Sequence, residues 1–221
     1  MHLLGKLSAF AAKGSISIME PSYGVMTRQA RSKFLDWSGC TNQRHEQDDK
    51  ALDESHRRIL SLRASPDAKD PLFFWQIYSL TGREPVLEIL TTFYNRVFDD
   101  EEAEWFRSIF DELSSKAYHI QVQTQMWIDC FGGGRLYGGG EFRLDFHHRE
   151  SQAIELMNAR GAERWVYHMK ASLDQQDDRL KDIDERIRPA INSFLQFFIE
   201  TYGKNFDFPT TPNLFGETCL P

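Results

Sequence analysis

Cysteine is scarce in this sequence, and its scarcity excludes two classes of protein. The 221 residues contain only Cys40, Cys130 and Cys219, which are widely separated and never form a CxxC motif. An odd, scattered set of this kind does not predict a disulfide framework or a cysteine zinc site. We therefore expect a protein of a reducing intracellular compartment.

The sequence also has no excess of basic residues and no long apolar run. The formal charge is −7 and the isoelectric point is near 5.5, which argues against nucleic acid as a partner. The most apolar segment, FLQFFIETY, is far shorter than the roughly 20 residues that span a bilayer, so we expect a soluble protein without a membrane partner. A cytoplasmic location is expected. An organellar one is the alternative, because no acid precedes Glu20 and this leader is compatible with a transit peptide.

Composition divides the chain into three parts. Residues 1–71 combine a leader of small residues with the charge-dense run RHEQDDKALDESHRR, and we expect an extension that is partly disordered or helical. Apolar and aromatic residues become dense and periodic over residues 72–203, which we take as the functional domain. The remainder, 204–221, carries three prolines and no helical period, so an extended tail is expected.

Four amphipathic helices are predicted from apolar residues spaced three and four apart, over residues 83–98, 115–130, 160–174 and 184–202. Thr81 and Glu84 have the spacing of a capping box at the start of the first helix. Pro189 predicts either an early kink or a late start of the last helix. No alternation with period two is long enough for a sheet, so the fold class is all-α.

The stretch CFGGGRLYGGGEFRLDFHHRE, residues 130–150, interrupts this helical pattern with six glycines. It matches neither the GxxxxGK[ST] nor the GxGxxG phosphate-binding pattern. A plain linker would not carry so many apolar side chains between its glycines. We therefore predict an ordered, irregular connector that leads to a short turn bearing His147 and His148.

Polar groups also interrupt the apolar faces of the predicted helices. Tyr94 lies in the stripe of the first helix and Trp165 in that of the third, while His119 and Gln123 share one face of the second helix with Met126. Buried polar groups of this kind cost about 1–3 kcal/mol each unless they are hydrogen-bonded. They either satisfy one another or converge on a ligand.

Four blocks of the chain together resemble one known family. They are TFYNRVFDDEEAEWFRSIF, FGGGRLY, HHR and GAERWVYHMKASLD, which lie in this order within residues 72–203. This combination is similar to group II truncated haemoglobins, in particular the plant-like ones, and implies a truncated (two-over-two) globin fold around haem b, iron protoporphyrin IX. The chain departs from the family in having Gly134 and Arg135 where proline is usual, and in the lengths of the segments on either side of the HHR block.

The resemblance also implies roles for individual residues. His148 matches the axial ligand of the haem iron, with His147 as the alternative, because length differences flank this position. The resemblance places in the haem pocket the residues Tyr94, Phe110, His119, Gln123, Met126 and Trp165. Lys116, Arg143 and Arg149 are the candidate cationic partners of the haem propionates.

The function implied is reversible binding of O₂, and of NO, at a five-coordinate iron in a polar distal pocket. Buried donors would make O₂ release slow. The alternative is a haem enzyme, a nitric oxide dioxygenase or a peroxidase, which would need a reductase as electron donor. In that case His119 would act as a proton acceptor, and a third possibility is that His119 itself ligates the iron.

Overall fold

The computed structural model describes residues 72–134, 136–137, 140–216 and 218, and within these ranges the chain is helical. The elements are η2 (Phe74–Gln76), α5 (Ile77–Thr81), α6 (Glu84–Phe98), α7 (Glu104–Leu113), α8 (Lys116–Cys130), α9 (Gly140–Glu150), η3 (Gln152–Leu156), α10 (Ala159–Gln175), α11 (Asp177–Ile183) and α12 (Ile187–Asn205). The all-α fold class is thereby confirmed.

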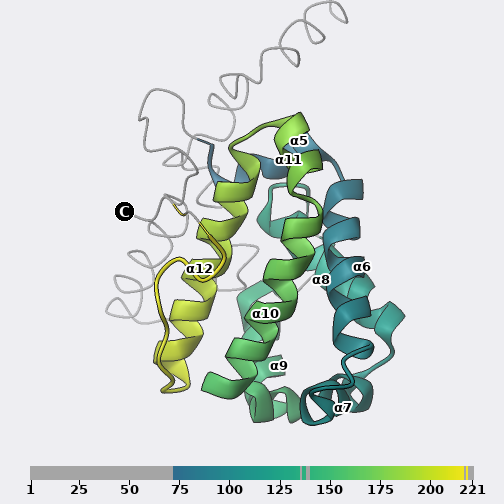
Figure 1. The fold of residues 1–221 in the computed structure, drawn as a ribbon, viewed down its shortest axis with the longest axis vertical. Helices are drawn as coiled ribbons and strands as arrows, with labels where there is room; N and C mark the ends of the chain where they lie inside the picture. Colours follow the sequence, from purple (N-terminus) through teal and green to yellow (C-terminus); the bar gives the residue numbers. More distant parts are fainter. Residues whose placement is uncertain (1–71, 135, 138–139, 217, 219–221) are drawn as a thin grey trace, which may run out of the picture.

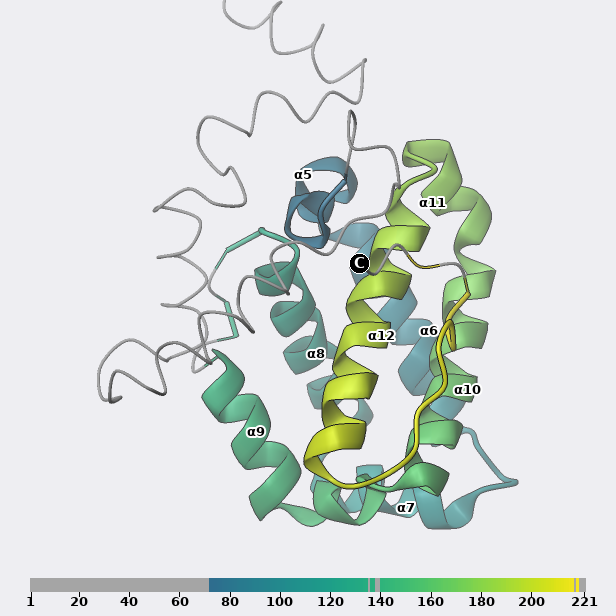
Figure 2. The same cartoon turned by 90° about the vertical axis from the view of Figure 1, so that its left-hand side faces the viewer.

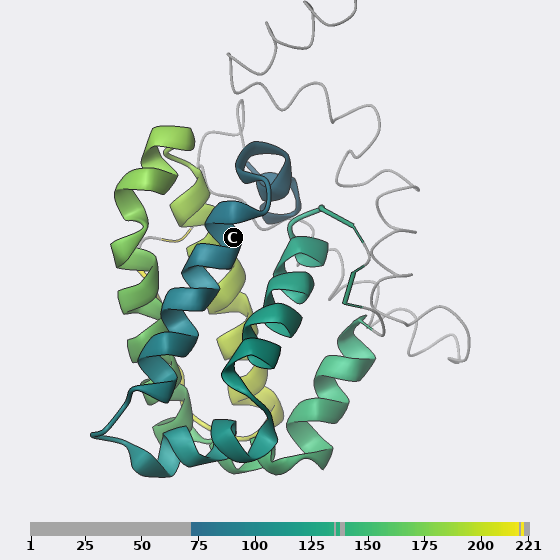
Figure 3. The same cartoon turned by 90° about the vertical axis from the view of Figure 1, so that its right-hand side faces the viewer.

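Four long helices form the body of the domain. Helix α6 packs against α8 on one side and α10 on the other, and α12 lies beside α10 (Figures 1 and 2). The short helix α7 and the 3₁₀ turn η3 close one end, while α9 leans away from α8 (Figures 2 and 3). The side chains that fill the space between the long helices are apolar and fully buried, among them Ile89, Leu90, Phe93, Trp127, Met169, Leu173, Ile191 and Phe194. Burial of this surface is what holds the helix pairs together.

The four predicted helices are present with similar bounds. The largest differences are in α12, which was predicted over 184–202 and spans Ile187–Asn205. Helix α12 begins at Ile187, so Pro189 lies in its first turn, where a missing amide costs no hydrogen bond. The predicted capping box is wrong. The N-cap of α6 is Arg83, and the Thr81 hydroxyl instead donates to the carbonyl oxygens of Ile77 and Gly82.

The predicted short turn at His147 and His148 is also wrong, because both residues lie in α9, near its C-terminal end. The irregular connector ends at Gly140, where α9 begins. The sequence hides this helix because it starts at a glycine and has no clear apolar stripe. Helices α7 and α11, with ten and seven residues, were likewise not predicted as helices.

The segment after α12 contains no helix over the residues described, and it runs back along α12 (Figure 2). Side chains of α12 hold it there: Gln196 donates to the Thr211 carbonyl oxygen at 2.9 Å and accepts from the Leu214 amide at 3.0 Å. The predicted extension, residues 1–71, lies outside the described residues. Among those described, no helix has the length and apolarity to cross a bilayer.

Candidate functional site

A cavity of about 400 Å³ lies in the domain, bordered by α6, α7, α8, α9, α10 and α12. Every residue that the sequence places in the pocket lines this one cavity, as do both candidate ligand histidines: Tyr94, Phe110, His119, Gln123, Met126, Trp165, His147 and His148. Positions separated by up to 71 residues in the chain therefore converge. The rest of the lining is mainly aromatic and aliphatic, which suits a large apolar ligand.

The ring of His148 is oriented by a hydrogen bond to the backbone. Its Nδ1 lies 2.9 Å from the carbonyl oxygen of Leu144, one turn earlier in α9. A carbonyl oxygen only accepts, so Nδ1 carries a proton, and in the neutral ring Nε2 then carries the lone pair. In metal-binding histidines, a hydrogen bond at the other ring nitrogen fixes the tautomer and the orientation of the ring. The ring also packs against Tyr202, with centroids 4.9 Å apart.

Tyr94 supplies a buried phenol from α6, and its side chain is only 5% exposed. Its ring lies edge-on to Phe93 at 4.9 Å and to Phe110 at 6.2 Å. Burial raises the pKa of Tyr94 far above its usual value, and the nearby Tyr137 raises it further. The hydroxyl therefore keeps its proton and remains a hydrogen-bond donor at any physiological pH.

His119 stacks on Tyr94, with ring centroids 5.3 Å apart and the planes within 22° of each other. Its Nε2 lies 3.0 Å from the carbonyl oxygen of Phe110, to which Nε2–H must donate. Burial lowers the pKa of His119, so the neutral ring is favoured. The ring thus joins the C-terminal turn of α7 to α8, and coordination through Nε2 would require this bond to break.

Tyr137 is a buried cavity residue to which the sequence assigned no role in the pocket. The carboxylate of Asp129, at the end of α8, accepts from the backbone amides of Leu136 at 2.6 Å and of Tyr137 at 2.8 Å. These two bonds fold the glycine-rich connector back onto the helix and bring the Tyr137 side chain to the cavity. An acidic residue just before a glycine run was the available signal.

Two of the three predicted propionate partners, Lys116 and Arg149, do not line the cavity. Lys116 lies 4.0 Å from Asp99 and over the Phe98 ring, and Arg149 lies over the ring of Phe206 at 5.0 Å. Neither is among the described residues that line the cavity. The side chain of Arg143 lies outside the part that the structure describes.

The fold and the cavity agree with comparisons to known sequences. The model of the bacterial-like globin family matches residues 76–197, more than half of the chain. The chain is 32% identical to "Group 2 truncated hemoglobin 3-1" of Lotus japonicus over 142 residues, which are 60% of this chain and 79% of the relative. It is 35% identical to "Two-on-two hemoglobin-3" of Arabidopsis thaliana over 127 residues, 57% of this chain and 65% of that relative.

The family model and both relatives place the chain in the class of globins. This chain belongs to the bacterial-like, truncated branch of that class, and its two plant relatives are named a group 2 truncated hemoglobin and a two-on-two hemoglobin. The family implies a haem cofactor and small diatomic ligands.

Proposed function

We propose that the chain holds haem b in this cavity through Nε2 of His148 and binds O₂, and also NO, reversibly. One observation carries the proposal: the Nδ1 bond to Leu144 makes Nε2 the ligating nitrogen of a histidine that lines an apolar cavity. A volume of about 400 Å³ falls within the usual range for ligand sites. The aromatic lining and the oriented imidazole of His148 fit a flat, largely apolar group.

Haem with one protein ligand offers its remaining axial position to a diatomic molecule. The chain contributes donors to that position. The Tyr94 hydroxyl, the Trp165 indole N–H and the Gln123 amide are hydrogen-bond donors of residues that line the cavity. Most of the cavity lining is apolar, and hydrogen bonds in such surroundings are stronger than in water, so we expect tight binding and slow release of O₂.

The enzymatic alternative places different demands on His119. A proton acceptor needs a lone pair directed at the ligand, whereas Nε2 of His119 is engaged as a donor to Phe110. Only Nδ1 could accept a proton in this tautomer. We therefore favour ligand binding over a dioxygenase or peroxidase reaction. Nitrate production over many turnovers with a reductase present would overturn that preference.

Absorption spectra of the full-length protein with added haem test the proposal. We expect a Soret band for the wild type and for His147→Ala, and a band that is lost or collapsed for His148→Ala. The reduced wild-type spectrum shows whether the iron is five-coordinate. A wild type that takes up no haem would contradict the proposal, and loss of the band only in His147→Ala would transfer the ligand role to His147.

A further inference from the structure

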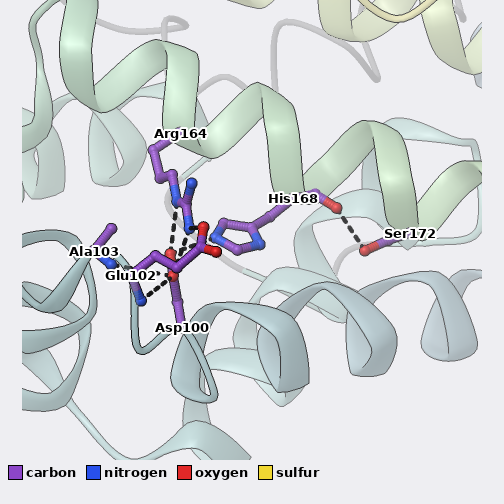
Figure 4. A network of polar contacts seen from close by, with 6 residues as sticks. All are labelled: Asp100, Glu102, Ala103, Arg164, His168 and Ser172. Atoms are coloured by element: carbon purple, nitrogen blue, oxygen red, sulfur yellow. Dashed lines mark hydrogen bonds and ion pairs between the residues drawn. The ribbon is translucent and has the colours of Figure 1, made fainter.

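A buried carboxylate lies outside the cavity and connects three segments of the domain. Asp100, in the turn between α6 and α7, is 5% exposed and accepts five hydrogen bonds (Figure 4). Two come from the amides of Glu102 and Ala103, at 3.2 Å each. The other three come from Arg164 and His168, both on α10. This set of donors fills the acceptor capacity of the carboxylate.

Asp100 and Arg164 form a bidentate ion pair. Nε donates to one carboxylate oxygen at 2.7 Å, and Nη2 donates to the other at 2.6 Å. The Arg164 hydrogen bonds hold the pKa of Asp100 far below its usual range, so the carboxylate stays charged. Glu102 adds a contact to Nη2 at 3.2 Å, and the guanidinium lies over the Tyr167 ring at 4.7 Å. A fork of this kind fixes orientation as well as distance.

His168 completes the group from one turn further along α10. It is 3% exposed, its Nε2–H donates to Asp100 at 2.8 Å, and its ring stacks on Phe106 of α7 with centroids 5.8 Å apart. Its Nδ1 is buried without a hydrogen-bond partner among the described residues. Burying an imidazole that makes a single hydrogen bond costs free energy, because one ring nitrogen is unsatisfied. An aliphatic side chain in the same place would bury no polar atom.

The position of these residues on α10 connects them to the cavity. Trp165 directly follows Arg164 and lies three residues before His168. It therefore belongs to the part of α10 that is bonded to Asp100. The indole lines the cavity and packs against Phe93, the neighbour of Tyr94 on α6. A shift of α10 against the α6–α7 turn would therefore move the indole relative to the Tyr94 hydroxyl.

We propose that Asp100, acting through Arg164 and His168, is a positioning residue that fixes the Trp165 indole N–H in the cavity relative to the Tyr94 hydroxyl. None of the three residues lines the cavity, so they act only through α10 and the turn. The expected effect on O₂ release rests on the ligand-binding function proposed above. The position of the Trp165 indole can be tested without haem.

The first test follows Trp165 itself in the full-length protein without added haem. Tryptophan is replaced by 5-fluorotryptophan, and the Trp165 fluorine resonance is assigned from its loss in Trp165→Phe. We expect one sharp resonance in the wild type and a shifted or broadened one in Asp100→Asn. The control is Asp174→Asn, which removes a carboxylate of the same helix that binds Arg188 at 2.7 Å. A Trp165 resonance that is the same in Asp100→Asn as in the wild type overturns the proposal.

A second pair of variants covers the case in which Asp100→Asn does not fold, as judged by circular dichroism. His168→Leu removes the bond to Asp100 but keeps the ion pair between Asp100 and Arg164, whereas His168→Gln keeps an N–H at a similar reach. We expect the Trp165 resonance to shift in His168→Leu and to return toward the wild-type position in His168→Gln. Equal spectra for the two variants would contradict a positioning role.

The second test uses the haem-loaded protein and measures the O₂ dissociation rate by stopped flow. Loss of a well-placed donor predicts a rate about tenfold higher in Asp100→Asn, and no change in Asp174→Asn. If the wild type binds no haem or no O₂, the proposed function fails, while the fluorine spectra still decide the positioning role. If the wild type binds O₂ and Asp100→Asn releases it at the same rate, the positioning role fails alone.

Discussion

Replacing Tyr94 with phenylalanine removes one hydroxyl from the cavity and leaves the ring packing almost intact. The side chain is 5% exposed and contacts Phe93, Phe110 and His119 through its ring, so the variant keeps these contacts. Burial keeps the phenol protonated, and the hydroxyl is therefore a donor at every pH of interest. What is lost is one hydrogen bond to a ligand that carries partial negative charge.

A hydrogen bond to a charged group contributes about 1.5–3 kcal/mol, which corresponds to a change of roughly 10- to 150-fold in a rate of release. We expect the O₂ dissociation rate of Tyr94→Phe to rise within this range, measured by mixing the O₂ complex with excess CO in a stopped-flow instrument. The control is Tyr78→Phe, because Tyr78 does not line the cavity.

A dissociation rate of Tyr94→Phe within twofold of the wild type would refute the role of the hydroxyl as a donor. A similar rise in Tyr78→Phe would refute the reasoning in another way, because the effect would then come from a general loosening of the fold. Unfolding midpoints of both variants distinguish that loosening from a local effect.

The remaining predictions concern stability. Alanine usually stabilises a helix by up to about 1 kcal/mol over glycine, but a Cβ on Gly161 would lie 2.8 Å from the carbonyl carbon of Leu156. We therefore expect Gly161→Ala to lower the free energy of unfolding by about 2 kcal/mol in urea titration, and a gain would contradict the packing of α10 on η3. Burial lowers the pKa of His119, so its neutral form favours the folded state above the ordinary histidine pKa, and that stability is lost as the pH falls below it. The midpoint urea concentration should decrease when the pH is lowered from 7.5 to 5.5, and it should decrease less in His119→Phe. An equal decrease in both proteins would exclude His119 as a contributor to the pH dependence of stability.

The sequence predicted those features that repeat along the chain. Helices α6, α8, α10 and α12 each bury a long apolar stripe, and such a stripe is visible in the residues themselves. Helix α9 has no stripe and begins at a glycine, so its helical form depends on neighbours that lie outside its own sequence. This is why His147 and His148 were assigned to a turn.

The candidate site was predictable as a set of residues but not as a geometry. The polar interruptions at Tyr94, His119, Gln123 and Trp165 do converge on one cavity. The bond from His119 to a backbone carbonyl leaves no trace in residue types, because every residue carries a carbonyl. The pairing of Asp100 with Arg164 joins positions 64 residues apart, and a charge pattern along the chain does not select one such pair among many.

The bond between His148 and the Leu144 carbonyl has a thermodynamic consequence. It exists only while the last turns of α9 are helical, so an intact α9 presents the imidazole and a frayed one releases it. A group bound at Nε2 would therefore stabilise the helical form of α9, and by linkage the helical form would strengthen binding of that group by the same free energy. Under the proposed ligation by His148, cofactor retention and local helix stability are reciprocal quantities. A substitution that unwinds α9 would then weaken cofactor binding even where it changes no residue that lines the cavity.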